Sequence, residues 1–319
     1  MRYKILIVGA GQLGSRYLQG LSKVQFPLDI FVSDVSAESL AQAEARWNEV
    51  VSSNTSHKVD YVVGLLGLPD NIDIAIIATL ADVREKIVMQ LSNQVKVRYW
   101  ILEKLLAQNV DDLLSIKDVI SQNGMAWVNT PMHIWSLYRN IRSHYDDKPG
   151  SVDATFDKVN RLACNAIHYI DYISRWNKAL PVSVDTSNLF HQWEPTKREG
   201  FYDVYGELII DFSDGSKLKI IGNNDDPNKR VNIIKVNKEE LHVSESQGIA
   251  TALDGITITG RCEFQSELTA PLVESILQIQ SCDLPTFTES VIQHRMLLES
   301  LLKHWNTYMP NKLERLPIT

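Results

Sequence analysis

The sequence predicts an α/β protein in which a doubly wound parallel sheet is followed by an α+β domain built on a large, mostly antiparallel open sheet. Three observations support this fold class. Short apolar strands alternate with amphipathic helices up to about residue 131, a glycine-rich turn joins the first strand to the first helix, and long strands follow one another from residue 202 to about residue 265. Alternation predicts a parallel sheet covered on both faces, whereas uninterrupted strands predict an antiparallel sheet.

The first half of the chain contains apolar runs of strand length, separated by segments with helical periodicity. We expect strands at Tyr3–Val8, Ile30–Ser33, Ile74–Ala78, Trp100–Leu102 and Ala126–Val128, and helices at Gln12–Ser22, Ala37–Asn48, Val83–Gln94 and Asp111–Asn123. The last helix ends at an Asn-Gly pair, which is a common C-terminal stop. Ligands collect at the carboxyl ends of the strands in such sheets.

The pattern changes after Pro131. We expect helices at Met132–His144, Ile167–Lys178, Glu267–Ser281 and Thr286–Asn306, a hairpin of Gly206–Phe212 and Lys217–Ile221 around Asp214-Gly215, and a polar turn or loop at Asn223–Arg230. The chain length suits two domains. We expect them at residues 1–131 and 132–319, with the closing helix able to pack back on the first domain.

The most specific motif consists of three glycines between the first strand and the first helix. Gly9 permits a tight turn, Gly11 lets the backbone approach a pyrophosphate, and Gly14 lets the helix pack closely on the sheet. Gln12 and Leu13 open this helix, and its positive dipole end faces the phosphates. A purely architectural glycine turn is the alternative. The context of strand, turn, helix, strand and acid predicts a Rossmann domain that binds a dinucleotide.

The acid of this pattern is Asp34, which lies 20 residues after Gly14 at the end of the second strand. A carboxylate at this place accepts both ribose hydroxyls and repels a 2′-phosphate. We therefore expect NAD, with NADP the less favoured cofactor.

Composition excludes several other classes of protein. The 319 residues carry a formal net charge of −7 without long runs of one sign, which argues against nucleic acid or an anionic membrane as a partner. No apolar run reaches the length of a membrane span, and the N-terminus enters a strand instead of a signal peptide. Three cysteines without CxxC spacing, and histidines without ligand spacing, predict neither disulfides nor a metal site. We expect a cytoplasmic protein.

Two further clusters carry side chains suited to proton transfer. Lys104, next to Glu103 at the end of a buried strand, can donate to a substrate oxygen and lower the pKa of a hydroxyl, although a solvated ion pair explains the pattern equally well. His168 and Asp171 share one helix face with Asn165, so the carboxylate could orient the imidazole. A structural histidine is the commoner alternative.

Cys164 and Trp135 are neighbours of these clusters. Cys164 lies one helical turn before His168, so the two could form a nucleophilic pair, although a small apolar filler is the commoner role of a cysteine. Trp135 closes the polar-aromatic segment 129–135, which we expect near the reacting end of the cofactor.

Four motifs in this order resemble the glucose–fructose oxidoreductase/inositol dehydrogenase/MocA family over nearly the whole chain. They are Ile7–Gly14, Asp73–Thr79, Glu103-Lys104-Leu105 and His168–Asp171, and Pro285–His294 is similar to the family's last helix. The resemblance implies a Rossmann domain and an α/β domain whose open sheet mediates assembly into a homodimer or homotetramer. It also implies a tightly held nicotinamide cofactor and hydride transfer at a carbon of a sugar-like substrate.

Carried onto this sequence, the resemblance assigns roles to single residues. Lys104 polarises the reacting oxygen, His168 acts as acid or base, and Asp171 holds His168. Asn165 contacts the substrate or the ribose. Trp135 is expected to contact the substrate because of its place in the segment 129–135, and not because of the resemblance. Besides the glycines, Gln12, Leu13 and Asp34, the cofactor-binding residues are expected to include Thr79, Glu103 and Lys104.

The sequence also departs from the family pattern. Leu105 replaces the proline after the lysine, so we expect no cis peptide bond there. Arg84 stands where a histidine is frequent, and Leu80 replaces a proline. Cys164 takes the place of an aspartate that many members use in catalysis, so a relay through that carboxylate cannot operate.

These observations favour an NAD-dependent oxidoreductase that acts on a CH–OH group of a sugar, nucleotide sugar or related polyol. The whole chain, including Leu316–Thr319, is similar to members that modify activated or acidic sugars for surface polysaccharides. Two alternatives stay open: a non-catalytic regulator that binds NAD or a sugar, and an NAD-dependent glycosidase.

Overall fold

The chain folds into two compact units, each with its own sheet. The computed structural model describes residues 2–145, 152–222, 232–236 and 239–319. The first unit comprises Met1–Ala107, Asp112–Asn129 and Glu263–Phe287, and the second comprises Gln108–Asp111, Thr130–Cys262 and Thr288–Thr319. The main body of the first unit ends at Asn129, and Glu263–Phe287 also groups with this unit.

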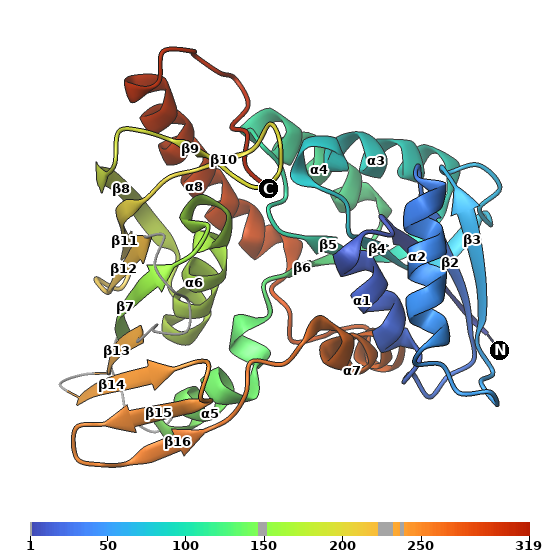
Figure 1. Cartoon of the computed structure of the whole chain (residues 1–319), viewed down its shortest axis with the longest axis horizontal. Helices are drawn as coiled ribbons and strands as arrows, with labels where there is room; N and C mark the ends of the chain where they lie inside the picture. Colours follow the sequence, from blue (N-terminus) through green and yellow to red (C-terminus); the bar gives the residue numbers. More distant parts are fainter. Residues whose placement is uncertain (1, 146–151, 223–231, 237–238) are drawn as a thin grey trace. The chain divides into compact units, whose positions relative to one another are not determined.

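The first unit is built on a six-stranded parallel sheet with the order β3-β2-β1-β4-β5-β6 (Figure 1). The strands are β1 (Tyr3–Val8), β2 (Leu28–Asp34), β3 (Lys58–Val63), β4 (Asn71–Ile77), β5 (Lys96–Glu103) and β6 (Met125–Asn129). The strands β1 and β4 are almost fully buried, as expected for a sheet covered on both faces. The edge strand β3 is only partly buried and was not predicted.

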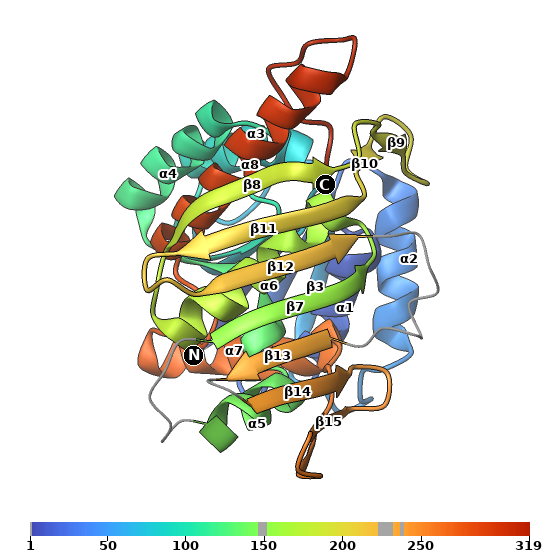
Figure 2. The ribbon, with the colours of Figure 1, turned by 90° about the vertical axis from the view of Figure 1, so that its left-hand side faces the viewer.

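Helices flank this sheet on both sides. Figures 1 and 2 show α3 (Ala81–Gln94) and α4 (Val110–Asn123) on one side and α1 (Gln12–Leu21) and α2 (Ala37–Asn48) on the other. Helix α7 (Gln265–Ile279) packs against α1, and the approach is so close that a Cβ on Gly20 would lie 2.6 Å from the Cβ of Thr269. Helix α7 groups with the first unit, whereas α8 (Phe287–Tyr308) groups with the second unit from Thr288 onward.

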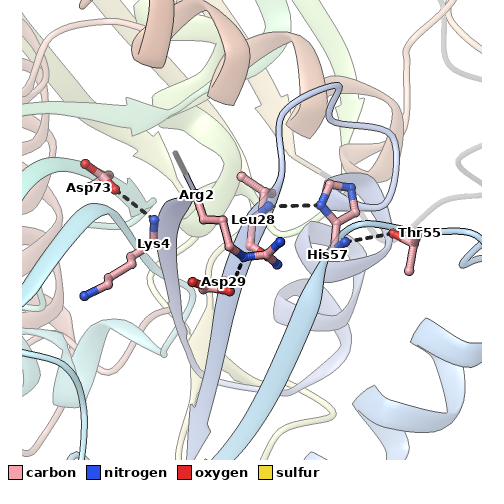
Figure 3. Close-up of polar contacts among 7 residues, drawn as sticks. All are labelled: Arg2, Lys4, Leu28, Asp29, Thr55, His57 and Asp73. Carbon is pink, nitrogen blue, oxygen red and sulfur yellow. Dashed lines mark hydrogen bonds and ion pairs between the residues drawn. The ribbon is translucent and has the colours of Figure 1, made fainter.

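Polar contacts join the amino ends of the parallel strands (Figure 3). The Arg2 guanidinium donates to Asp29 Oδ1 at 2.6 Å, and the Lys4 amide donates to Asp73 Oδ2 at 2.8 Å. The Leu28 amide donates to Nδ1 of a histidine in the loop before β3 at 3.3 Å. These bonds join β1, β2 and β4 at the end of the sheet where the strands begin, which is the end opposite to the glycine turn.

The second unit contains an eight-stranded sheet with the order β16-β15-β14-β13-β7-β12-β11-β8. Only the β12–β7 pair is parallel among its described strand pairs, so the predicted mostly antiparallel sheet is confirmed. Its strands are β7 (Val152–Val159), β8 (Pro181–Leu189), β11 (Gly206–Phe212), β12 (Lys217–Gly222), β13 (Asn232–Val236), β14 (Glu239–Ser244), β15 (Ile249–Ala252) and β16 (Thr257–Thr259). The short strands β9 (Glu194–Pro195) and β10 (Tyr202–Asp203) pair separately.

The predicted hairpin around Asp214-Gly215 is confirmed, whereas the segment Asn223–Arg230 lies outside the described residues. The expected helix Met132–His144 is divided into a 3-10 turn, η1 (Pro131–Ile134), and α5 (Ser136–Tyr145), because Trp135 has extended ψ. Helix α6 (Leu162–Asn177) packs on β7 and β12 and begins five residues earlier than predicted.

Candidate functional site

The predicted cofactor loop has the backbone geometry that its glycines require. Gly9 has a φ of +98°, and its amide donates to the carbonyl of Ser33 at 2.8 Å. A Cβ on Gly14 would lie 1.8 Å from the carbonyl oxygen of Gly9, so only glycine lets α1 approach the loop this closely. The strand, turn and helix therefore form one rigid corner.

Gly11 differs from the other two glycines, because a Cβ there would meet nothing within 4 Å. It is the N-cap of α1, and no side chain within the described ranges caps this helix. No acidic residue lies in the first turn, where Leu13 is 38% exposed. The amides of the first turn and the positive end of the helix dipole are thus available to an anion. The chemistry of this helix terminus therefore suits a phosphate group.

Asp34 lies at the end of β2 beside the loop. One carboxylate oxygen accepts the Ala10 amide at 2.7 Å, and the other accepts the Ser36 amide at 2.9 Å. These bonds fix the carboxylate, and each oxygen keeps acceptor capacity for a ribose hydroxyl. The geometry suits recognition of a diol next to the pyrophosphate.

Glu103 closes β5 and is buried with 4% exposure. Its Oε1 accepts the Tyr17 hydroxyl and the Asn129 amide, both at 2.6 Å, and Asn129 also donates to Gln265 at 2.8 Å. Burial raises the pKa of Glu103, although these hydrogen bonds and nearby positive charges oppose the shift, and burial next to this carboxyl raises the pKa of Tyr17 well above its usual range. Glu103 therefore ties α1 to β6. No role for Tyr17 was predicted from the sequence. Its position one helical turn after Gly14 was the only sequence feature that could have indicated one.

Lys104 is half-buried and directly follows this network. The peptide bond between Lys104 and Leu105 is cis, so the expectation that the leucine removes the cis bond was wrong. The carbonyl of Leu105 accepts a hydrogen bond from the buried guanidinium of Arg84, which also donates to the carbonyl of Thr79. Arg84 thus connects the segments that follow β4 and β5, which carry Thr79 and Lys104.

The predicted acid/base residues of the second unit lie on α6. His168 and Asn165 are half-buried, and the Asn165 side chain donates to the carbonyl of Asn160 at 2.8 Å. Asp171 is fully buried, and its described contacts are with residues other than His168. Its carboxylate lies 3.5 Å from His133 Nδ1 and accepts Gln293 Nε2 at 3.4 Å.

Trp135 follows η1 and is half-buried, with its ring 6.3 Å from that of Tyr138. His133, two residues earlier, is buried, and its Nδ1 lies 3.5 Å from the Asp171 carboxylate. The position of His133 in the polar-aromatic segment 129–135 was the only sequence signal for this pair.

A separate concave region lies at the amino ends of the parallel strands. This cavity of about 380 Å³ includes four basic residues in its lining, Arg2, Lys4, Lys96 and Arg98. Arg2 is paired with Asp29, as Figure 3 shows. The helices that connect the parallel strands have their C-termini at this end of the sheet. Positive charges here therefore complement the negative ends of the helix dipoles. We therefore assign the basic residues a structural role.

Comparison with known proteins tests the fold. No protein-family model matches the sequence, and no curated protein matches it significantly. UDP-N-acetylglucosamine 3-dehydrogenase GnnA from Acidithiobacillus ferrooxidans matches with a TM-score of 0.70 and 13% identity, over 94% of this chain and 96% of that chain. For myo-inositol 2-dehydrogenase from Lactobacillus plantarum the TM-score is 0.68 and the identity 14%, over 95% and 97% of the two chains. The chain therefore shares the fold of these two dehydrogenases.

The same fold occurs in biliverdin reductase from Synechocystis sp. PCC 6803, in complex with biliverdin and NADP+, with a TM-score of 0.72 and 13% identity over 93% of this chain and 98% of that chain. Proteins with this fold therefore act on chemically different substrates. None of the helices among the described residues is sufficiently long and apolar to cross a bilayer.

Proposed function

We propose that the protein is an NAD-dependent oxidoreductase that transfers hydride between nicotinamide and a hydroxyl-bearing carbon of a sugar, nucleotide sugar or related polyol. The observation that carries this proposal is the open space at Gly11, at the uncapped N-terminus of α1 and beside the fixed carboxylate of Asp34. This combination provides an anion site next to a diol site, as a dinucleotide requires.

The cofactor would be held by the loop Gly9–Gly14, Asp34 and the segments after β4 and β5, with Gln12, Leu13, Thr79 and Glu103 as further contacts. When bound, nicotinamide supplies the acceptor or donor of hydride. Lys104 stabilises negative charge on the reacting oxygen, and His168 takes the hydroxyl proton in the oxidative direction and returns it in the reductive direction. Asn165 and Trp135 bind the substrate.

Mass spectrometry of small molecules released by heat, followed by NAD(H) titration, tests cofactor binding. Lys104→Ala and His168→Ala are then expected to lower kcat by at least about 100-fold while the Kd for NAD stays within about threefold. Lys86→Ala and His144→Ala, which remove exposed residues of the same types, are matched controls. Unchanged turnover in both active-site variants contradicts the assigned roles and favours a regulator. Release of a glycosidic group without net NADH favours the glycosidase.

The choice of NAD over NADP follows from the negative charge of Asp34. Replacing Asp34 with Ser removes the repulsion of a 2′-phosphate and one diol acceptor, so the preference for NAD should fall by at least about tenfold. Equal affinity of the wild type for NAD and NADP contradicts the proposal. A nucleotide sugar used for surface polysaccharide is one member of the proposed substrate class.

We also propose that the protein works in a reducing cytoplasm and assembles into a homodimer or homotetramer through the eight-stranded sheet. Figure 2 looks onto the face of this sheet opposite to α6. This face carries half-buried Ile209 and Ile221, and Val182 on β8 is 57% exposed. A partner would remove these side chains from water. Sedimentation analysis of wild type and Ile209→Lys tests the assembly, and a wild-type monomer contradicts it.

A further inference from the structure

The segment Leu316–Thr319 is held firmly against the second unit. Its first amide donates to the carbonyl of Gln108 at 2.9 Å, and the Gln108 side chain donates to the carbonyl of Ile318 at 3.1 Å. The Tyr202 amide donates to the carbonyl of Pro317 at 2.8 Å. Ile318 is buried with 1% exposure. Hydrogen bonds from two sides and a buried anchor give this short segment a defined position.

The last residue of the segment reaches the start of α6. The main-chain oxygen of Thr319 accepts a hydrogen bond from the Cys164 thiol at 2.7 Å and another from the Arg161 guanidinium. Arg161 is the N-cap residue of α6, and Cys164 and His168 are four residues apart within the helix, so these two lie on one face of it. Thr319 therefore lies beside the row of side chains that leads to His168.

The thiol at position 164 is what permits this arrangement. Cys164 is buried with 4% exposure, and it offers a hydrogen to the Thr319 oxygen. An aspartate at the same position, as the family resemblance leads one to expect, would place an acceptor-only carboxylate against that oxygen and repel it. The replacement of the aspartate and the position of the segment are thus physically linked.

We infer that Leu316–Thr319 forms a wall of the substrate pocket, and that Cys164 and Arg161 are positioning residues that hold this wall next to His168. The inference rests on the proposed function, because the role of His168 makes this face of α6 the substrate side. It assigns a specificity-determining part to a segment that follows the last helix, and it explains how the chain uses the position of the missing carboxylate.

Cys164→Asp and Cys164→Asn form a matched pair, because the two side chains have the same shape and only the amide can donate to Thr319. Hydrogen–deuterium exchange of the peptide that contains residues 313–319 reports the wall without any activity. We expect exchange to rise at least about tenfold in Cys164→Asp and to stay within about threefold of wild type in Cys164→Asn. Arg161→Gln and Arg161→Lys form a second pair. We expect exchange to rise at least about tenfold in Arg161→Gln, which loses the positive charge, and to stay within about threefold of wild type in Arg161→Lys, which keeps it.

Steady-state kinetics with UDP-N-acetylglucosamine and myo-inositol as probe substrates tests the pocket. Cys164→Asp should raise KM at least about tenfold, with kcat less affected and the Kd for NAD unchanged, and Cys164→Asn should restore KM. Equal exchange in the Asp and Asn variants overturns the inference, and so does raised exchange with unchanged KM. Failure of the wild type to bind NAD overturns the proposed function itself, and this is read from the titration independently of the exchange comparison.

Discussion

The glycine loop offers a pair of substitutions that separate folding from cofactor binding. In Gly14→Ala the new Cβ would lie 1.8 Å from the Gly9 oxygen, so the backbones must separate by about 1.2 Å to reach the closest approach of 3.0 Å. Overpacking of this kind costs about 1–3 kcal/mol, and the better helix propensity of alanine returns about 1 kcal/mol. We expect a net loss of stability of up to about 2 kcal/mol.

In Gly11→Ala the new methyl group enters open space, and the backbone at φ −61° and ψ −167° is accessible to alanine. The poorer N-cap costs less than about 1 kcal/mol. The methyl nevertheless occupies the space proposed for the pyrophosphate, so NAD affinity should fall about 100-fold, or about 2.7 kcal/mol. Urea denaturation and calorimetric titration measure the two effects. Wild-type NAD affinity in Gly11→Ala would refute the proposed binding mode.

Two further predictions concern buried polar groups. Burial raises the pKa of Asp203 to about 6 from an ordinary value of 3.8, so the stability that this group contributes is fully present below about pH 4 and is lost as the pH rises through about 6. Asp203→Asn should remove up to about 3 kcal/mol of that pH dependence, and parallel pH-dependent denaturation curves for the two proteins would contradict it. Tyr17→Phe removes one of the hydrogen bonds to buried Glu103 and should cost about 1–3 kcal/mol of unfolding free energy, whereas an unchanged melting temperature would argue against the network.

The sequence was informative where one physical requirement dominates. The buried part of β1, residues 5–8, is apolar throughout, and the loop after it needs glycine at positions 9 and 14, so both were predicted closely. The edge strand β3 was not predicted, because it is partly exposed and has lysine, aspartate and tyrosine between its valines, which hides the apolar pattern of a strand. Similarly, η1 and α5 form one continuous helical pattern, and only the backbone at Trp135 divides them.

Long-range partners could not be predicted. The Tyr17–Glu103 bond joins residues 86 positions apart, and the Cys164–Thr319 bond joins residues 155 positions apart. Spacing along one helix identifies which side chains share a face, but it cannot show what packs against that face. The cis peptide bond between Lys104 and Leu105 could not be predicted either, because a leucine after the bond does not favour the cis form. The candidate residues were therefore easier to name than their interactions.

Asp171 shows how this difference changes an expected phenotype. If Asp171 held His168, Asp171→Asn would displace the pH dependence of kcat, because the carboxylate stabilises a charged imidazole. The structure instead gives it His133 at 3.5 Å and Gln293 at 3.4 Å, all within the second unit. We expect Asp171→Asn to lose about 1–3 kcal/mol of stability while the pH profile of kcat keeps its midpoint.

His133→Gln is the informative companion of this variant, since it removes the ring that contacts Asp171 and leaves α6 intact. Both substitutions should lower the unfolding free energy, and the double variant should cost less than the sum of the two, because they break one shared contact. A displaced pH profile in Asp171→Asn alone would show that the carboxylate acts on His168 during turnover. If the two losses of unfolding free energy are additive and the pH profile of kcat is unchanged, the contact between Asp171 and His133 contributes little to stability. The hydrogen bond from Gln293 is then the contact that stabilises the buried Asp171 carboxylate.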